Sequence, residues 1–398
     1  MRLALQMFTL GIRFRRVKRK MHPRETMMTT VAEPSTTAMT PIQHFAEANA
    51  EEQPGRQLES LRQSAVAFRE WFTTTGSPDW IGTFDLVTLP YPTRFGLFRA
   101  SLSPAPFLSL TNRLFVIRWH DPDGRLRTML FEPSDVELGR RTPYFARLSE
   151  STPDVFERLF AKPMGEVTTH LRRVGIDAAD VDWITFDHLH TQDVRRWIGT
   201  TEPAPDISPG RPVSPVFPNA KLIVQRAELE SLKALHPLQL PWYQPHAYTD
   251  LRPDAVMAID GDVLMAPGVA LLATPGHTIG NHTLVLNTET GVWAASENVI
   301  ATECLTPESS SIPGVRRWAR NWSQEVILNA NTIEDTARQY NSCVVEKTVV
   351  DRSRLDSRFL QFMPSSELTR NPLAPGTSPT FTHGGIFHGT LAPPMSKK

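Results

Sequence analysis

The spacing of apolar residues predicts one long helix early in the chain, followed by a series of strands. Leu58, Leu61, Ala65 and Phe68 recur at helical spacing and predict a helix over Gln57–Phe72. From there on, apolar runs of strand length cover residues 108–119, 127–131, 181–186, 220–225, 269–273, 283–286, 291–295 and 359–363. Helical patterns cover residues 153–174, the stretch that starts at Arg226, and residues 332–344. Strands and helices therefore alternate, which is typical of a layered α/β fold.

Composition narrows the class of protein. The chain has 398 residues, of which 40% are hydrophobic, so it can bury a sizeable core. Its 42 basic and 42 acidic side chains balance, which argues against a general nucleic-acid or membrane-surface binder. No apolar run reaches the length of a transmembrane helix. Two cysteines cannot form a disulfide framework, so we expect a reducing compartment and a cytoplasmic protein.

The amino-terminal region differs in character from the rest. Residues 1–20 carry seven basic side chains and no acid, so they fit either an organellar transit peptide, a disordered leader, or a start assigned too early. Residues 29–55 are rich in Thr, Ala, Glu and Pro, which is typical of a flexible segment. We therefore expect a leader over residues 1–55, a helical extension over 56–81 and the main domain over 82–398. Six prolines predict a loop at 199–219 within that domain.

Three short stretches carry candidate chemistry. His188 and His190 follow a predicted strand at i and i+2, so both imidazoles can point the same way and share one metal ion. His277 lies on a Pro-Gly turn after another strand, and Glu297 ends a third. Each residue taken alone fits a structural role at least as well. Together, histidines and a carboxylate at strand ends predict a site for zinc, or for iron or manganese.

In order and spacing these residues resemble the metallo-β-lactamase superfamily. That family's signature is H-x-H-x-D-H after a strand, then a Pro-Gly-His turn, then an acid at a strand end and a late histidine. Residues 217–228, Phe-Pro-Asn-Ala-Lys-Leu-Ile-Val-Gln-Arg-Ala-Glu, resemble the segment after the first motif in its lactonase-like branch. The resemblance implies a four-layer αββα sandwich. It also implies that His188, His190 and His277 hold the first metal and that Glu297 takes the bridging acid position.

The chain departs from this signature at the second metal site. Gln192 and Asp193 occupy the positions of the Asp and the last His of H-x-H-x-D-H. Pro364-Ser-Ser-Glu367 stands where the late histidine is expected, and His383 or His388 could fold back to replace it or could belong to a tail loop. We therefore expect one tightly bound metal, most simply Zn²⁺, and a second site that is weak or absent.

A metal held by three histidines predicts hydrolysis of an ester or lactone, with a metal hydroxide attacking the carbonyl carbon. Asp193 would ligate the metal, or orient the water or shuttle its proton, or else fix a histidine from outside. The aromatic segment 241–248 and the loop 199–219 could wall an apolar pocket for a small-molecule substrate; ordinary loop packing is the alternative for 241–248. A homodimer is possible.

Two other functions fit the same residues. A site with histidines, one acid and open positions also suits the mononuclear iron oxygenases of this superfamily. The altered second site would also fit a catalytically silent binding protein. The identity and number of bound metal ions would separate these functions.

Overall fold

An antiparallel five-stranded sheet forms one half of the structure. In this computed structural model, which describes residues 39–151 and 161–391, its strands follow the order β1-β10-β11-β12-β13. Their bounds are β1 Thr40–Pro41, β10 Val263–Ala266, β11 Val269–Ala273, β12 His282–Thr288 and β13 Gly291–Ala295. The strands β11 to β13 are buried over most of their length, as expected of a sheet between two covering layers.

An eight-stranded mixed sheet forms the other half, in the order β15-β2-β3-β4-β5-β8-β9, with β14 also paired to β3. Its strands are β2 Trp80–Pro92, β3 Phe107–His120, β4 Leu126–Phe131, β5 Trp183–Thr185, β8 Lys221–Gln225, β9 Val256–Ile259, β14 Ser366–Thr369 and β15 Phe387–Gly389. The four strands β4, β5, β8 and β9 run parallel. Their carboxyl ends therefore meet at one edge of the sheet.

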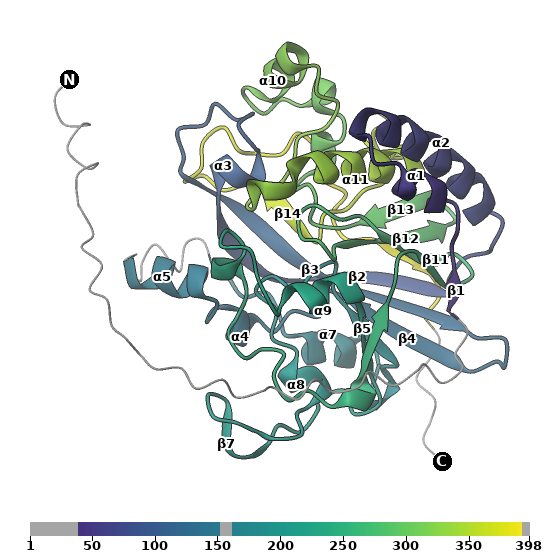
Figure 1. Cartoon of the computed structure of the whole chain (residues 1–398), viewed down its shortest axis with the longest axis vertical. Helices are drawn as coiled ribbons and strands as arrows, with labels where there is room; N and C mark the ends of the chain where they lie inside the picture. The colour runs from purple at the N-terminus through teal and green to yellow at the C-terminus, as the bar shows by residue number, and fades with distance from the viewer. Residues whose placement is uncertain (1–38, 152–160, 392–398) are drawn as a thin grey trace. The chain divides into compact units, whose positions relative to one another are not determined.

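Helices cover the outer face of each sheet, so the molecule has four layers (Figure 1). The helices α2 Pro54–Phe72 and α11 Thr336–Val349 pack on the five-stranded sheet. On the eight-stranded sheet lie α7 Val167–Arg173, α8 Arg195–Ile198 and α9 Arg226–Ser231. A third apolar cluster fills the space between the sheets, and it contains the parallel pair of Trp119 and Trp183 rings. The predicted αββα sandwich is confirmed.

The remaining helices are short and connect these layers. They are α1 Ala46–Ala50, α3 Thr93–Gly96, α4 Val136–Gly139, α5 Pro143–Ser151 and α10 Val315–Trp322. No helix in the described part of the chain is long and apolar enough to cross a membrane.

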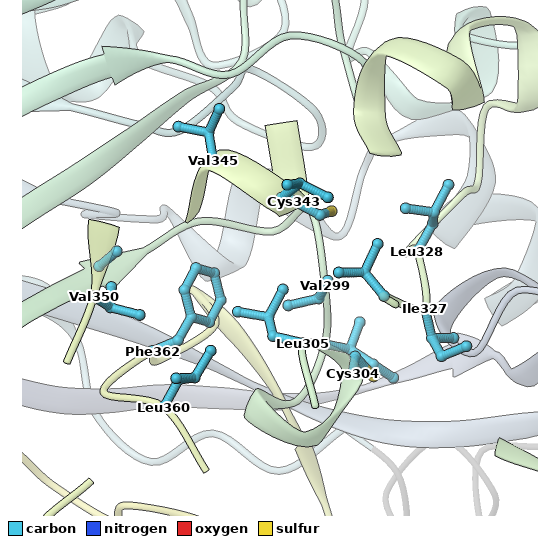
Figure 2. Close-up of a cluster of buried hydrophobic side chains, with 14 of the residues drawn as sticks. Val299, Cys304, Leu305, Ile327, Leu328, Cys343, Val345, Val350, Leu360 and Phe362 are labelled. Carbon is cyan, nitrogen blue, oxygen red and sulfur yellow. The ribbon is translucent and has the colours of Figure 1, made fainter. Parts of the chain in front are cut away.

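The core beneath α11 anchors the strand end that carries Glu297. Figure 2 shows part of this cluster, in which Val299 and Phe362 pack among other fully or nearly fully buried side chains. Cys304 and Cys343 both lie in it as free, buried thiols. Burial raises the pKa of each thiol, so neither is poised as a nucleophile.

Several sequence-based expectations about the elements are corrected. The leader expected over residues 1–55 extends too far into the chain. The strand β1 pairs with β10, and Ile42, Phe45 and Ala48 are buried in the core. Of the helix expected over 153–174, residues 152–160 lie outside the described part. The helix that is described begins only at Val167. Residue 163 instead forms a bridge to β2.

In two other segments the backbone pairing differs from what the sequence predicted. The proline-rich segment 199–219 contains a short hairpin of β6 Pro203–Ala204 and β7 Ser208–Pro212. The strand expected over residues 359–363 is reduced to single bridges, from Phe362 to Ala294 and from Leu360 to Arg352. That segment still runs beside β13, since Met363 N–H donates to the Ala294 carbonyl.

Candidate metal centre

Three buried histidines from both sheets meet at one point. His188 and His190 follow β5, and His277 lies on the turn after β11. Their ring centroids are 4.5 Å (188–190), 4.6 Å (188–277) and 5.2 Å (190–277) apart. One nitrogen of each ring lies within 4.8 Å of the others, which is the spacing that a single shared ion requires. The three histidines named from the sequence are therefore brought together.

One nitrogen of each imidazole ring has a hydrogen-bond partner in the protein, which fixes the orientation of the ring. His188 Nδ1 donates to Asp187 Oδ1 at 2.5 Å, and His277 Nδ1 donates to the Asn329 carbonyl at 2.9 Å. His190 Nε2 donates to Oε1 of Gln239. The remaining nitrogens His190 Nδ1 and His277 Nε2 are buried with no partner among the described residues. Unpaired buried imidazole nitrogens that converge on one point fit a divalent metal ion.

The charges around the rings differ sharply. Burial lowers the pKa of His188, but the Asp187 carboxylate outweighs it and raises that pKa to about 9. Burial and the charge on His188 lower the pKa of His277 to about 3, and the same two causes hold the pKa of His190 well below its usual value. Two of the three rings are therefore neutral at pH 7, the form that binds metal.

Glu297 lies beside this cluster. One of its oxygens lies within 4.8 Å of Asp187 and His188 ligand atoms, so it adjoins His188 and not the whole histidine set. Burial raises the pKa of Glu297, His188 lowers it, and the net value is about 7. Asn329 Nδ2 donates to its backbone carbonyl at 3.0 Å. This carboxyl group is therefore held at the site with a pKa suited to proton transfer.

The positions of a second metal have other partners. Gln192 Nε2 donates to Ser134 Oγ at 3.0 Å and to Glu132 Oε2 at 3.4 Å. Asp193 pairs with Arg195 at 2.7 Å and also accepts from Gln244. The structure does not bring Asp193 to the three histidines, and a role there would require breaking this buried ion pair.

The late histidines also lie elsewhere. His383 Nε2 donates to the Leu360 carbonyl at 2.8 Å, and its ring packs against Trp293. His388, on β15, contacts Glu289 at 2.9 Å. At the place expected for the late histidine, Ser365 Oγ donates to Asp187 Oδ2 at 2.5 Å. Neither histidine is part of the metal-type groups found among the described residues.

Glu132 is a site residue that the sequence analysis missed. It directly follows β4 and has a left-handed backbone, φ 60°, which is uncommon for a residue other than glycine. Its Oε1 accepts the Asp187 N–H at 2.7 Å, so the carboxyl holds the residue that orients His188. Burial and the Asp187 charge raise its pKa well above the usual range. Glu132 could have been found from the sequence, because it is an acid that follows an apolar strand, the same pattern that pointed to Glu297.

A cavity of about 460 Å³ opens onto this cluster. His190, Gln192 and Glu297 line its polar end, and most of the remaining lining is apolar. The apolar residues of the wall come mainly from β2, β3 and α5 and include Val87, Leu89, Tyr91, Phe107, Phe145 and Leu148. Trp242, from the aromatic segment 241–248, completes the wall and stacks on Tyr144 at 4.2 Å. The loop 199–219, which we expected to border the site, contributes no lining residue.

No protein-family model matches the chain, and part of its sequence is similar to known lactonases. An N-acyl homoserine lactonase of Bacillus sp is 32% identical over 119 residues, which are 30% of this chain and 38% of that protein. One of Bacillus cereus is 30% identical over 123 residues, 31% of this chain and 40% of that protein. The match thus spans about two fifths of these curated relatives. The solved structure of AidC, a dizinc quorum-quenching lactonase, is 11% identical, covering 68% of this chain and 83% of its own, with a TM-score of 0.42.

The four-layer sandwich has a metallo-β-lactamase-like fold. Over about a third of its length the chain is similar in sequence to N-acyl homoserine lactonases, and the described residues bring three histidines together.

Proposed function

We propose that this protein hydrolyses an ester or lactone that carries an apolar chain, with a single metal ion held by His188, His190 and His277. The observation that carries the proposal is the pair of unpartnered nitrogens, His190 Nδ1 and His277 Nε2, in a histidine cluster of which His190 lines the polar end of an apolar cavity. A bound zinc-type ion would supply a Lewis acid and lower the pKa of a water molecule to about 7. One ion is proposed because Gln192, Asp193 and Ser365 each have a protein partner already.

The chain's own residues would orient the substrate and move the proton. Glu297 lines the cavity beside His188, and its pKa of about 7 allows it to accept a proton from water and return it to the leaving oxygen. Trp242 and the apolar wall would hold the alkyl part of the substrate and exclude water from it. The names of the curated relatives make N-acyl homoserine lactones the first substrates to test.

Hydrolysis by purified protein tests the proposal. The full chain would be stripped of metal, reloaded with Zn²⁺, Mn²⁺ or Fe²⁺, analysed for bound metal, and assayed against alkyl esters and acyl lactones of increasing chain length. We expect one metal per chain and turnover that improves with chain length until the cavity is filled. Glu297→Gln should keep the metal and lose most turnover, because the amide cannot carry the proton.

Three outcomes would overturn the proposal. About one equivalent of iron with oxygen consumption would favour an oxygenase. Binding of these lactones without turnover, under every metal, would favour a binding protein. Two tightly held zinc ions would contradict the single-metal site.

A further inference from the structure

The carboxylate of Glu228 joins the two turns that carry the histidines. Glu228 lies on α9 and is fully buried. Its Oε1 accepts hydrogen bonds from Leu189 N–H at 3.1 Å and from the Tyr243 hydroxyl at 2.5 Å. Its Oε2 accepts from the Thr278 hydroxyl at 2.7 Å and from Gly280 N–H at 3.1 Å. Four donors therefore surround the two oxygens of one side chain.

The donors lie on both histidine turns, so Glu228 is hydrogen-bonded to each of them. Leu189 stands between His188 and His190, whereas Thr278 directly follows His277. One turn follows β5 in the eight-stranded sheet, and the other follows β11 in the five-stranded sheet. A single side chain thus bridges the two halves of the sandwich, at the point where the histidines from each half must meet.

Close packing makes this bridge rigid. A Cβ placed on Gly280 would lie 2.3 Å from Glu228 Cβ and 2.5 Å from its backbone nitrogen, so the turn lies directly against α9. The Tyr243 ring also packs on the His190 ring, with centroids 4.9 Å apart. The backbone of α9 and the ring of Tyr243 therefore leave the carboxylate little freedom to move relative to either turn.

We propose that Glu228 is a positioning residue that sets the separation of the two histidine turns and thereby the geometry and affinity of the metal site. This inference rests on the metal site of the proposed function, but not on hydrolysis. Hydrogen bonds to a carboxylate are stronger than those to a neutral acceptor. Mutation of a residue that supports the metal ligands without binding the metal lowers metal affinity by about 10- to 100-fold. Residues outside the ligand set would then determine how well the three nitrogens converge.

Glu228→Gln tests the proposal, because the amide keeps the shape but its nitrogen cannot accept two of the four hydrogen bonds. Glu303→Gln is a matched control, since Glu303 is also fully buried and accepts from Thr380 N–H, away from the histidine turns. For each protein, Zn²⁺ affinity would be measured by competition with a chelating dye, the Co²⁺ absorption spectrum recorded, and the stability of the metal-free form measured in urea.

We expect Glu228→Gln to weaken Zn²⁺ binding by about 10- to 100-fold and to alter the Co²⁺ spectrum. Glu303→Gln should leave both unchanged. If Glu228→Gln fails to fold, Thr278→Val and Tyr243→Phe each remove one donor while keeping the size of the side chain. Each should weaken Zn²⁺ binding by a few-fold, and unchanged affinity in both would overturn the proposal.

A change in urea stability alone, with Zn²⁺ affinity and the Co²⁺ spectrum unchanged, would show a purely structural role and also overturn it. A wild-type protein that binds one Zn²⁺ but hydrolyses nothing would refute the proposed function while leaving the measurement on Glu228 valid. A wild-type protein that binds no metal would refute both.

Discussion

Removal of the His277 imidazole should abolish the stabilisation that zinc gives to the folded protein. His277 supplies one of three converging nitrogens and is fully buried. An ion that binds only the folded state stabilises it by about 2.7 kcal/mol when its free concentration is 100 times Kd. At roughly 2.1 cal/mol/K per residue, the unfolding entropy of the 398-residue chain is about 0.8 kcal/mol/K, so Tm should rise by about 3 °C.

In His277→Ala two imidazoles remain, and the same zinc concentration should raise Tm by less than about 1 °C. Thermal unfolding of each protein would be followed with chelator and with zinc. Comparing each variant with itself removes the cost of the cavity that the substitution creates. His383→Ala is the matched control, because that ring bonds to the Leu360 carbonyl outside the cluster and its loss should leave the zinc shift intact.

An equal zinc shift in His277→Ala and in the unmodified protein would refute the assignment of the first metal site. Loss of the shift in His383→Ala would show instead that the carboxyl-terminal segment reaches the metal.

Three further predictions concern the surroundings of the site. Asp187→Asn removes the charge that orients His188 and should weaken zinc binding by about 10-fold or more, measured by chelator competition; unchanged affinity would exclude this role. Trp242→Ala opens the cavity wall and should raise KM for long-chain substrates while zinc content, from elemental analysis, stays at one per chain. Burial raises the pKa of Asp262 to about 7, against 3.8 for an exposed carboxyl, although Ala273 N–H favours the charged form. The folded state then holds a proton that the unfolded state has lost, so stability is full below about pH 4 and falls by up to about 4 kcal/mol as pH rises through 7. Asp262→Asn should remove that slope in urea unfolding measured from pH 4 to 8, and an unchanged slope would contradict the burial argument.

Local sequence was enough to find the three histidines that meet in the structure. His188 and His190 are two residues apart past a strand, so the backbone alone directs both rings the same way. The Pro-Gly turn likewise determines where His277 leaves its strand. The helix α2 and the strands β3, β4 and β11 were predicted for the same reason, because their apolar spacing is set by the residue periodicity of each element.

Only the tertiary structure decided which side chains surround the three histidines. Glu132 reaches Asp187 because β4 and β5 pair in parallel with Phe131 opposite Thr185, a register that no local spacing reveals. Asp193 looked like a ligand by its position in the motif, yet it pairs with Arg195 and is held there by Gln244.

The late histidine and the buried acid on α9 show the same limit. His383 lies in the carboxyl-terminal segment, and its ring packs on Trp293 instead of turning toward the site. Glu228 was visible only as part of a family-like stretch, and its four hydrogen bonds come from three segments far apart in sequence. Strand ends set by residue periodicity can be predicted from sequence. Hydrogen-bond partners cannot be predicted in this way, because they depend on how the two sheets pack and on which buried groups this packing brings close to each donor.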